Sequence, residues 1–515
     1  MNQTKTGLIF NEDSDHFYHL HLPTDKCEHI TANDLRAYID TLANTDVTDF
    51  FCNVGGLLSG FPSKIKTSYP EKFLAVEGAD WSGTVLEVAY NIWLKNGLDL
   101  FQIWFDRCRE VGIRPWASVR MNDVHYLSAY KKGDSGSFLV PKEYYENFDR
   151  HSRIIHRPQT QYMDRAKNYE LQEVPDYMFS YLQEVLERYD VDGLELDFQR
   201  EMRCFAPGHE QSGRAVMTAF VGRVKELVTE MEAKRGHKIE IAARANPLPE
   251  GCWEQGFDII EWAKRGYLNL FIPAPRWSTT DNDMPIAIWK QILEPYGVKL
   301  AGGIEINAQA FSGSKTHVFN MTTETALGTA GYILSEGADS VYLFNYFGFH
   351  EHMDPAYDAL NHPLSPSGNR YLLSTAGTLE KIQKAPRKCL VTHRDFEAIW
   401  RTEDNGDLPK TVSKTTDPVY FHCRTGDILP TSKVTLHLGL AGEGISEQDL
   451  AVYVNSTPAK YLGKAPCAEP VLTESTVYAF DVPFSAIQPL TQVAEVVLLT
   501  EDKAITVDYM DITME

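Results

Sequence analysis

Acidic side chains occur in this sequence at points where a parallel sheet would end. The stretch VDGLELDFQRE, residues 191–201, carries Glu195 and Asp197 two residues apart inside an apolar run. Side chains two apart on a strand leave the same face, so both carboxyl groups are expected on one side of the sheet. A buried carboxylate is costly unless it is paired, hydrogen-bonded or used in chemistry. The stretch is therefore a candidate reaction site.

A third acid, Glu305, ends the seventh apolar run of the chain. In a closed barrel, Asp197 on strand four and Glu305 on strand seven would face each other across the axis. Two facing carboxyl groups can cleave a glycosidic bond: one donates a proton to the leaving oxygen, and the other attacks the anomeric carbon or activates water. We predict these two as the catalytic residues. The alternative is that they are unrelated acids that balance arginines.

Other polar and aromatic residues at the ends of the predicted strands are candidates for substrate binding. They are Asp13, His16, Arg120, Asn122, Asp123, His125, Glu195, Arg200, Arg244, Arg276, Trp277, Asn307 and Tyr346. The four arginines would suit a charged or densely hydroxylated sugar, and the rings of Trp277 and Tyr346 would offer a stacking face. No H-x-x-x-H or H-x-H spacing and no phosphate loop is present, so neither a metal nor a nucleotide cofactor is expected.

Eight short apolar runs alternate with longer amphipathic stretches in the first three quarters of the chain. The predicted strands span residues 7–11, 47–56, 113–123, 191–198, 238–247, 268–275, 298–307 and 340–347. Apolar residues fall at helical spacing over 174–190, 213–238 and 323–339. This alternation predicts an α/β fold, the (β/α)8 TIM barrel, in which catalytic groups lie at the C-terminal ends of the strands. A doubly wound sheet is disfavoured because no Gly-rich fingerprint follows the first strand.

The last part of the chain has a different pattern, with β-rich segments separated by turns and no helical spacing. These segments span 418–424, 433–440, 450–455, 476–483, 494–500 and 504–514. They predict a β-sandwich. We therefore expect two domains, a catalytic barrel over residues 1–385 and an accessory β-sandwich over residues 386–515.

Composition narrows the possible partners. The 515 residues carry a net charge of −22, which disfavours nucleic acid and anionic membranes. No apolar run approaches the length of a membrane span, and the N-terminal stretch lacks the pattern of a signal peptide. The eight cysteines are scattered, as is typical of reduced thiols, so we expect a cytoplasmic protein. Nothing in the sequence indicates an oligomeric state.

The stretch YDVDGLELDFQREMRCF, residues 189–205, resembles the strand-four signature of bacterial glycosyl-hydrolase-like TIM-barrel proteins, the family 10-like glycosyl hydrolases. That signature, roughly D-G-[IL]-x-[LF]-D-[FY]-x-R, falls on Asp192 through Arg200. RMNDVH (120–125) and KNYELQEV (167–174) are also similar to this group. The resemblance implies a barrel enzyme that acts on carbohydrates. The related chitinase motif D-G-x-D-x-D-x-E would place its catalytic glutamate where this chain has Gln199.

Three functions are compatible with these observations. The first is a glycoside hydrolase that cleaves a glycosidic bond in a carbohydrate substrate. The second is a non-hydrolytic barrel enzyme, a lyase or an isomerase, because arginines at strand ends could hold an acidic sugar. The third is a carbohydrate-binding barrel without catalytic activity.

Overall fold

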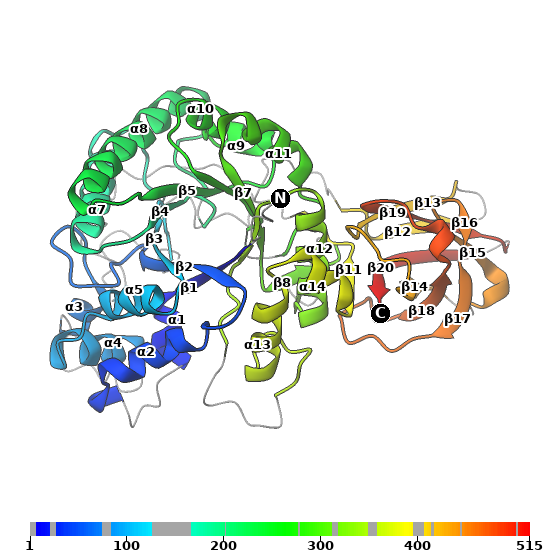
Figure 1. The fold of residues 1–515 in the computed structure, drawn as a ribbon. Coiled ribbons are helices and arrows are strands. Elements are labelled where there is room, and N and C mark those ends of the chain that lie inside the picture. The colour runs from blue at the N-terminus through cyan, green and yellow to red at the C-terminus, as the bar shows by residue number, and fades with distance from the viewer. Residues whose placement is uncertain are drawn as a thin grey trace, which may run out of the picture.

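The chain forms a barrel with a β-rich region beside it in the computed structural model (Figure 1). The structure describes residues 7–20, 27–74, 84–125, 166–200, 202–276, 279–311, 318–348, 358–394, 406–413, 417–442, 445–500 and 503–515.

Eight parallel strands close the barrel by hydrogen bonds in the order β1-β10-β7-β6-β5-β4-β3-β2. Their bounds are β1 Gly7–Asp13, β2 Val47–Gly55, β3 Arg114–Arg120, β4 Gly193–Asp197, β5 Glu240–Ala245, β6 Leu270–Pro273, β7 Lys299–Ile304 and β10 Ser340–Leu343. Each coincides with one of the eight predicted strands. The predicted (β/α)8 barrel is therefore confirmed.

Helices lie outside the strands and cover the barrel (Figure 1). They are α1 Ser14–Leu20, α2 Ala32–Asp40, α3 Tyr69–Leu74, α4 Val85–Tyr90, α5 Leu100–Glu110, α7 Glu173–Arg188, α8 Glu210–Arg235, α9 Pro249–Glu254, α10 Ile259–Lys264, α11 Ile286–Leu293, α12 Thr323–Ser335, α13 Pro366–Thr375 and α14 Leu379–Lys384. A short hairpin, β8 Asn307–Gln309 and β9 Val318–Asn320, follows β7 and was not predicted. Together with the other loops after the strands, this hairpin belongs to the C-terminal end of the barrel.

Two antiparallel sheets form the β-rich region. One contains β11 Arg387–Leu390, β12 Lys410–Ser413, β14 Val434–Ala441, β17 Lys460–Lys464, β18 Ser475–Val482 and β20 Ala504–Met514. The other contains β13 Val419–Arg424, β15 Leu450–Val454, β16 Thr457–Pro458 and β19 Thr491–Leu498. Alternate residues of both sheets meet in one apolar core, so the predicted β-rich character of this region is confirmed.

Close packing within the barrel and against it requires glycine at two positions. A Cβ atom at Gly193 would lie 2.0 Å from the ring of Trp116, which fills the barrel interior. A Cβ atom at Gly328 of α12 would lie 2.1 Å from the carbonyl oxygen of Lys388 in β11. The second contact places the first strand of the β-rich region directly against a barrel helix.

Candidate active site

Neighbouring strands bring three charged side chains into one row at the C-terminal end of the barrel. In the strand register, Asp197 of β4 lies between Arg120 of β3 and Arg244 of β5. Trp116 belongs to the inner core, and the period of two makes Arg120 point inward as well. On β4 the leucines of GLELD pack outward in the core shared with the helices, so its two acids point inward, as predicted.

The guanidinium of Arg244 lies between the two predicted catalytic carboxyl groups. Its Nη1 donates to Oδ1 and Oδ2 of Asp197 at 3.0 and 3.2 Å, and its Nη2 lies 3.8 Å from Oε1 of Glu305. The ring of Phe344 packs on the same guanidinium, with its centroid 3.9 Å from Cζ. Asp197, Arg244 and Glu305 are all buried. The structure therefore brings the two acids to the same cation.

Asp197 is surrounded by donors. Besides Arg244, its Oδ1 accepts the backbone N–H groups of Gln199 at 3.0 Å and Arg200 at 3.2 Å. These donors hold the side chain of Asp197 in one orientation.

Glu305 has fewer partners. Its Oε2 accepts the backbone N–H of Ile306 at 3.2 Å and the side-chain amide of Asn345 at 3.3 Å, while Oε1 accepts no hydrogen bond from the described part of the chain. Burial raises the pKa of Glu305 to about 7, although Arg244 and Arg200 favour its charged form. A carboxyl group with this pKa can both give and take a proton near neutral pH.

Glu195 lies one layer deeper in the barrel than Asp197. Its carboxyl oxygens are completely buried and have no hydrogen-bond partner among the residues that the structure describes. The hydroxyls of Ser118 and Tyr342 are near enough to favour the charged form, but neither reaches the carboxyl group in hydrogen-bonding geometry. Burial, together with the charge of Asp197, raises the pKa of Glu195 to about 8. With this pKa, Glu195 is mostly protonated at neutral pH.

Five of the predicted substrate-binding residues form one connected cluster. Arg120 contacts Asp13 through Nη2 and lies 3.5 Å from Oδ2 of Asp123 through Nη1. The other oxygen of Asp123 contacts Nδ1 of His125, whose Nε2 contacts the guanidinium of Arg200. Burial by itself would raise the pKa of Asp123, but His125 and Arg120 outweigh it and hold that pKa well below its usual range. Arg120 is therefore already paired with carboxylates of the protein.

His16 is near Asp13 of this cluster, whose charge acts on its imidazole, but its ring contacts other residues. Its ring stacks on Phe347 with the centroids 3.9 Å apart, and Nδ1 lies 3.4 Å from Oε1 of Glu12. The other oxygen of Glu12 accepts the hydroxyl of Tyr38. Burial lowers the pKa of His16 to about 3, so its imidazole is neutral at physiological pH.

Two residues that were predicted to bind substrate, Asn122 and Tyr346, donate hydrogen bonds to backbone carbonyls instead. The amide nitrogen of Asn122 donates to the carbonyls of Lys167 at 2.9 Å and Arg203 at 2.6 Å. Tyr346 is completely buried, and its hydroxyl donates to the carbonyl of Glu305 at 3.1 Å. Its ring is therefore not accessible for a sugar to stack on.

The remaining predicted residues lie on the loops after β6 and β7. Arg276 is buried after β6, and Trp277 lies outside the described residues. Asn307 begins the hairpin after β7, and its carbonyl accepts the backbone N–H of Thr280 at 2.7 Å.

The structure also adds residues that the sequence did not single out. Ser118 and Tyr342 lie near Glu195, the side-chain amide of Asn345 donates to Glu305, and the hydroxyl of Thr280 donates to the Glu305 carbonyl. Ser118 could have been found from the sequence because it lies two residues before Arg120 and so points to the same side of the strand. Asn345 could have been found because it lies just after the C-terminal end of a barrel strand. Thr280 had none, because it sits in a loop without periodicity.

Within the described ranges, no three His, Cys, Asp or Glu side chains come together in a way that could hold a metal ion. The helices in the same ranges are all too short or too polar to cross a membrane.

No protein-family model and no curated protein sequence matches this chain. Among solved structures, an α-amylase from Geobacillus thermoleovorans in complex with acarbose is 10% identical, with a TM-score of 0.37, and the match covers 97% of this chain and 100% of the amylase. The α-L-fucosidase isoenzyme 1 of Paenibacillus thiaminolyticus is 13% identical, with a TM-score of 0.35 and coverage of 97% and 98%. The GH30 xylanase C of Talaromyces cellulolyticus is 12% identical, with a TM-score of 0.33 and coverage of 97% and 98%. The fold assignment rests on the hydrogen-bonded barrel itself.

Proposed function

We propose that this protein is a glycoside hydrolase whose catalytic carboxyl groups are Asp197 and Glu305. The observation that carries the proposal is the placement of these two buried acids at the two amino groups of Arg244. Asp197 accepts hydrogen bonds from Arg244 and from two backbone N–H groups, whereas Glu305 has fewer partners and a pKa of about 7. An acid and a base in different environments are what hydrolysis of a glycosidic bond requires.

The environments of the two acids suggest how the roles divide. Glu305 donates its proton to the glycosidic oxygen as the bond to the anomeric carbon breaks. The negative charge left on Glu305 then faces Arg244, whose Nη2 is 3.8 Å away. Asp197 supports the positive charge that develops on the sugar, either by attacking the anomeric carbon or by taking a proton from the attacking water.

The domain organisation is part of the same proposal. We assign catalysis to a barrel over residues 1–385 and an accessory role to a β-sandwich over residues 386–515. The division is supported by β11, which begins at Arg387 and pairs with β20.

The test uses the purified full-length chain with a panel of polysaccharides and aryl glycosides, both neutral and acidic. Release of reducing ends or of the aryl group identifies a substrate, and NMR of the first product anomer shows retention or inversion. Asp197→Asn and Glu305→Gln should each lower kcat by roughly 10²–10⁴-fold while the protein stays folded.

Glu230→Gln, at an exposed position of α8, is the matched control and should keep full activity. Near-normal turnover in either catalytic variant would refute the pair. Products with a new double bond, without uptake of water, would instead show a lyase. Saturable binding of an oligosaccharide that is never cleaved would show an inactive binding barrel.

A further inference from the structure

A buried loop connects Glu305 to the β-rich region of the chain. This loop, residues 279–283, follows β6 and precedes α11. Its Thr280 hydroxyl donates to the carbonyl of Glu305 at 2.6 Å, and the backbone N–H of Thr280 donates to the carbonyl of Asn307 at 2.7 Å. The loop therefore fixes the chain on both sides of Ile306, directly at the proposed proton donor.

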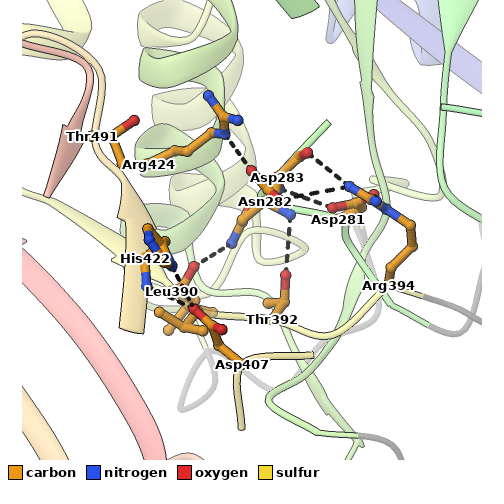
Figure 2. Close-up of a pocket in the computed structure, with 11 residues that line it drawn as sticks. Asp281, Asn282, Asp283, Leu390, Thr392, Arg394, Asp407, His422, Arg424 and Thr491 are labelled. Carbon is orange, nitrogen blue, oxygen red and sulfur yellow. Dashed lines mark hydrogen bonds and ion pairs between the residues drawn. The ribbon is translucent and has the colours of Figure 1, made fainter. Parts of the chain in front are cut away.

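The other end of the loop is held by the segment that leaves β11. Arg394 donates through Nε to Oδ2 of Asp281 at 2.7 Å and through Nη2 to the carbonyl of Asp283 at 2.8 Å (Figure 2). The side chain of Asn282 donates to the carbonyl of Leu390 at 3.1 Å, and its backbone N–H donates to the hydroxyl of Thr392 at 3.1 Å. Three consecutive loop residues are thus bound to residues 390–394.

A second path runs in parallel through the hairpin after β7. The backbone N–H of His393 donates to the carbonyl of Gln309 at 3.1 Å, and the N–H of Gln309 donates to the hydroxyl of Thr279 at 2.9 Å. Thr279 and Thr280 are both completely buried. The two paths meet at these threonines, next to Glu305.

On the side that faces water, the junction between residues 279–283 and the β-rich region contains exposed polar side chains. A cavity of about 260 Å³ opens there, lined in part by Asp283, Asp407, His422 and Arg424 (Figure 2). The side chains of Asp283 and His422 are 63% and 60% exposed, whereas Asp281 is 1% exposed. Pairs in contact with water contribute little, so the buried contacts of Asp281 and Asn282 are the ones that hold the loop.

We propose that residues 390–394 of the β-rich region position Glu305 for proton transfer through Thr280, with Arg394 and Thr280 as positioning residues. This inference rests on the proposed role of Glu305. Glu305 directly follows the last residue of β7, Ile304, so the barrel ladder ends just before it. Its carbonyl is held instead by the hydroxyls of Thr280 and Tyr346. A displacement of about 1 Å at a catalytic group can cost roughly 100-fold in rate.

The first experiment compares Thr280→Val with Thr280→Ser in the full-length enzyme. Valine keeps the shape of threonine but removes the hydroxyl, so kcat should fall about tenfold with little change in KM. Serine keeps the hydroxyl and should restore most of the rate. Thr375→Val is the control, because it also removes a hydroxyl that donates to a carbonyl, that of Tyr371 at 2.8 Å, but within α13.

The second experiment tests the remote end of the path. In the double variant Asp281→Asn/Arg394→Gln, two neutral amides replace the buried ion pair, so no charge is left unpaired. Kcat should again fall several-fold, and the fall should not add to that of Thr280→Val when all three changes are combined. Arg265→Met, which removes an exposed partner of Glu261, is the control for loss of an arginine.

A third measurement needs no substrate. The titration of Glu305 can be followed by carboxyl-carbon NMR of protein labelled at glutamate, with Glu305→Gln to assign the signal. The groups that influence Glu305 are Arg244, Arg200, Ile306 and Asn345, and Tyr346 also lies near it. A displaced Glu305 should titrate at a different pH in Thr280→Val and at an unchanged pH in Thr375→Val.

The outcomes separate the two proposals. If Glu305→Gln keeps its activity, the proposed function fails. If Glu305→Gln is inactive while Thr280→Val and the double variant keep normal kcat and an unchanged Glu305 titration, only the positioning role fails. A loss of kcat that serine does not restore, with an unchanged titration, would also overturn it.

Discussion

The two ends of the barrel interior are built from the same strands but from opposite kinds of residue. Toward the N-terminal end, Phe51 and Trp116 stack with their ring centroids 4.4 Å apart, and Tyr342 meets Phe51 edge-on at 5.6 Å. Toward the C-terminal end lie Arg120 of β3, Asp197 of β4, Arg244 of β5 and, directly after β7, Glu305, all buried. Strand parity alone makes both sets point inward.

The two layers therefore differ in their roles. The apolar layer stabilises the fold, whereas the charged layer consists of side chains that the fold holds in position. Removal of the apolar side chains from water and their close packing both stabilise the folded state. Buried ion pairs are weak evidence for stability, because the cost of removing charges from water can exceed their mutual attraction. Glu195, which has no hydrogen-bond partner among the described residues, adds a further cost. A polar layer that is costly to bury supports the proposal that these groups serve a function other than stability.

The largest expected effects test this contrast directly through one substitution at each end. Phe51→Ala should destabilise the protein by about 3–5 kcal/mol, because it leaves a cavity in the apolar layer. The folded fraction should keep its turnover. Glu305→Gln should show the reverse, a loss of roughly 10²–10⁴-fold in kcat with little change in stability.

Urea denaturation and initial rates on the same preparations give both quantities. If Glu305→Gln destabilises the protein as much as Phe51→Ala does, the polar end is part of the structural core and the contrast is wrong.

Arg244 offers the next largest effect. Arg244→Met leaves Asp197 buried without its cation and should cost about 3–5 kcal/mol in unfolding free energy. In the double variant Asp197→Asn/Arg244→Met, neither charge remains, so much of that loss should be recovered. Urea denaturation of the two single variants and the double variant measures the coupling.

Arg265→Met is the control for Arg244→Met. It removes an arginine whose partner Glu261 is exposed, and should change stability little. Equal effects at the two arginines would mean that Arg244 is not a buried partner of Asp197.

The main features of the fold could be predicted because they follow from periodicity. Alternation in GLELD placed Glu195 and Asp197 on one face, and the β-rich stretch 494–500 predicted most of β19. The hairpin of β8 and β9 escaped prediction, since strands of three residues are too short to show a period.

The site was predictable only in part. Parity and strand ends located Asp197, Arg244 and Glu305, but the sequence suggested that the arginine would bind a sugar. Its partner is Asp197, because the register of β4 and β5 sets the two side by side. Contacts such as Thr280 with Glu305, or His125 with Arg200, join residues 25 or 75 positions apart, and no local pattern encodes them.

A smaller effect is expected from the pH dependence of stability, through Glu195. Its pKa is about 8 in the folded protein and near the ordinary glutamate value when unfolded, so the folded state binds more protons between these values. Stability from this group is therefore present below about pH 4.5 and is lost as the pH rises toward 8. Glu195→Gln cannot titrate, so between pH 5 and 8 it should lose roughly 1–3 kcal/mol less than the parent protein.

Urea denaturation at several pH values measures this difference, and Glu230→Gln serves as the exposed control. Parallel curves for the parent protein and Glu195→Gln would show that Glu195 is already ionised, and the polar layer would then carry one more charge than proposed.

The smallest expected effect sharpens the contrast at a single hydrogen bond. Asn345 has a φ of 64°, a conformation that glycine adopts without strain, and its side-chain amide donates to Oε2 of Glu305 at 3.3 Å. Asn345→Gly should therefore keep the backbone while removing a donor that favours the charged form of Glu305. The pKa of Glu305 should rise by a few tenths of a unit. Because a proton donor must be protonated, the fall of kcat/KM above about pH 7 should move to higher pH by the same amount.

Asn44→Gly, at another asparagine with positive φ and far from Glu305 in the fold, is the control and should leave the profile unchanged. If instead the rise of kcat/KM on the acidic side of the profile moves to higher pH in Asn345→Gly, Glu305 acts as a base, and the roles of the two carboxyl groups would have to be exchanged.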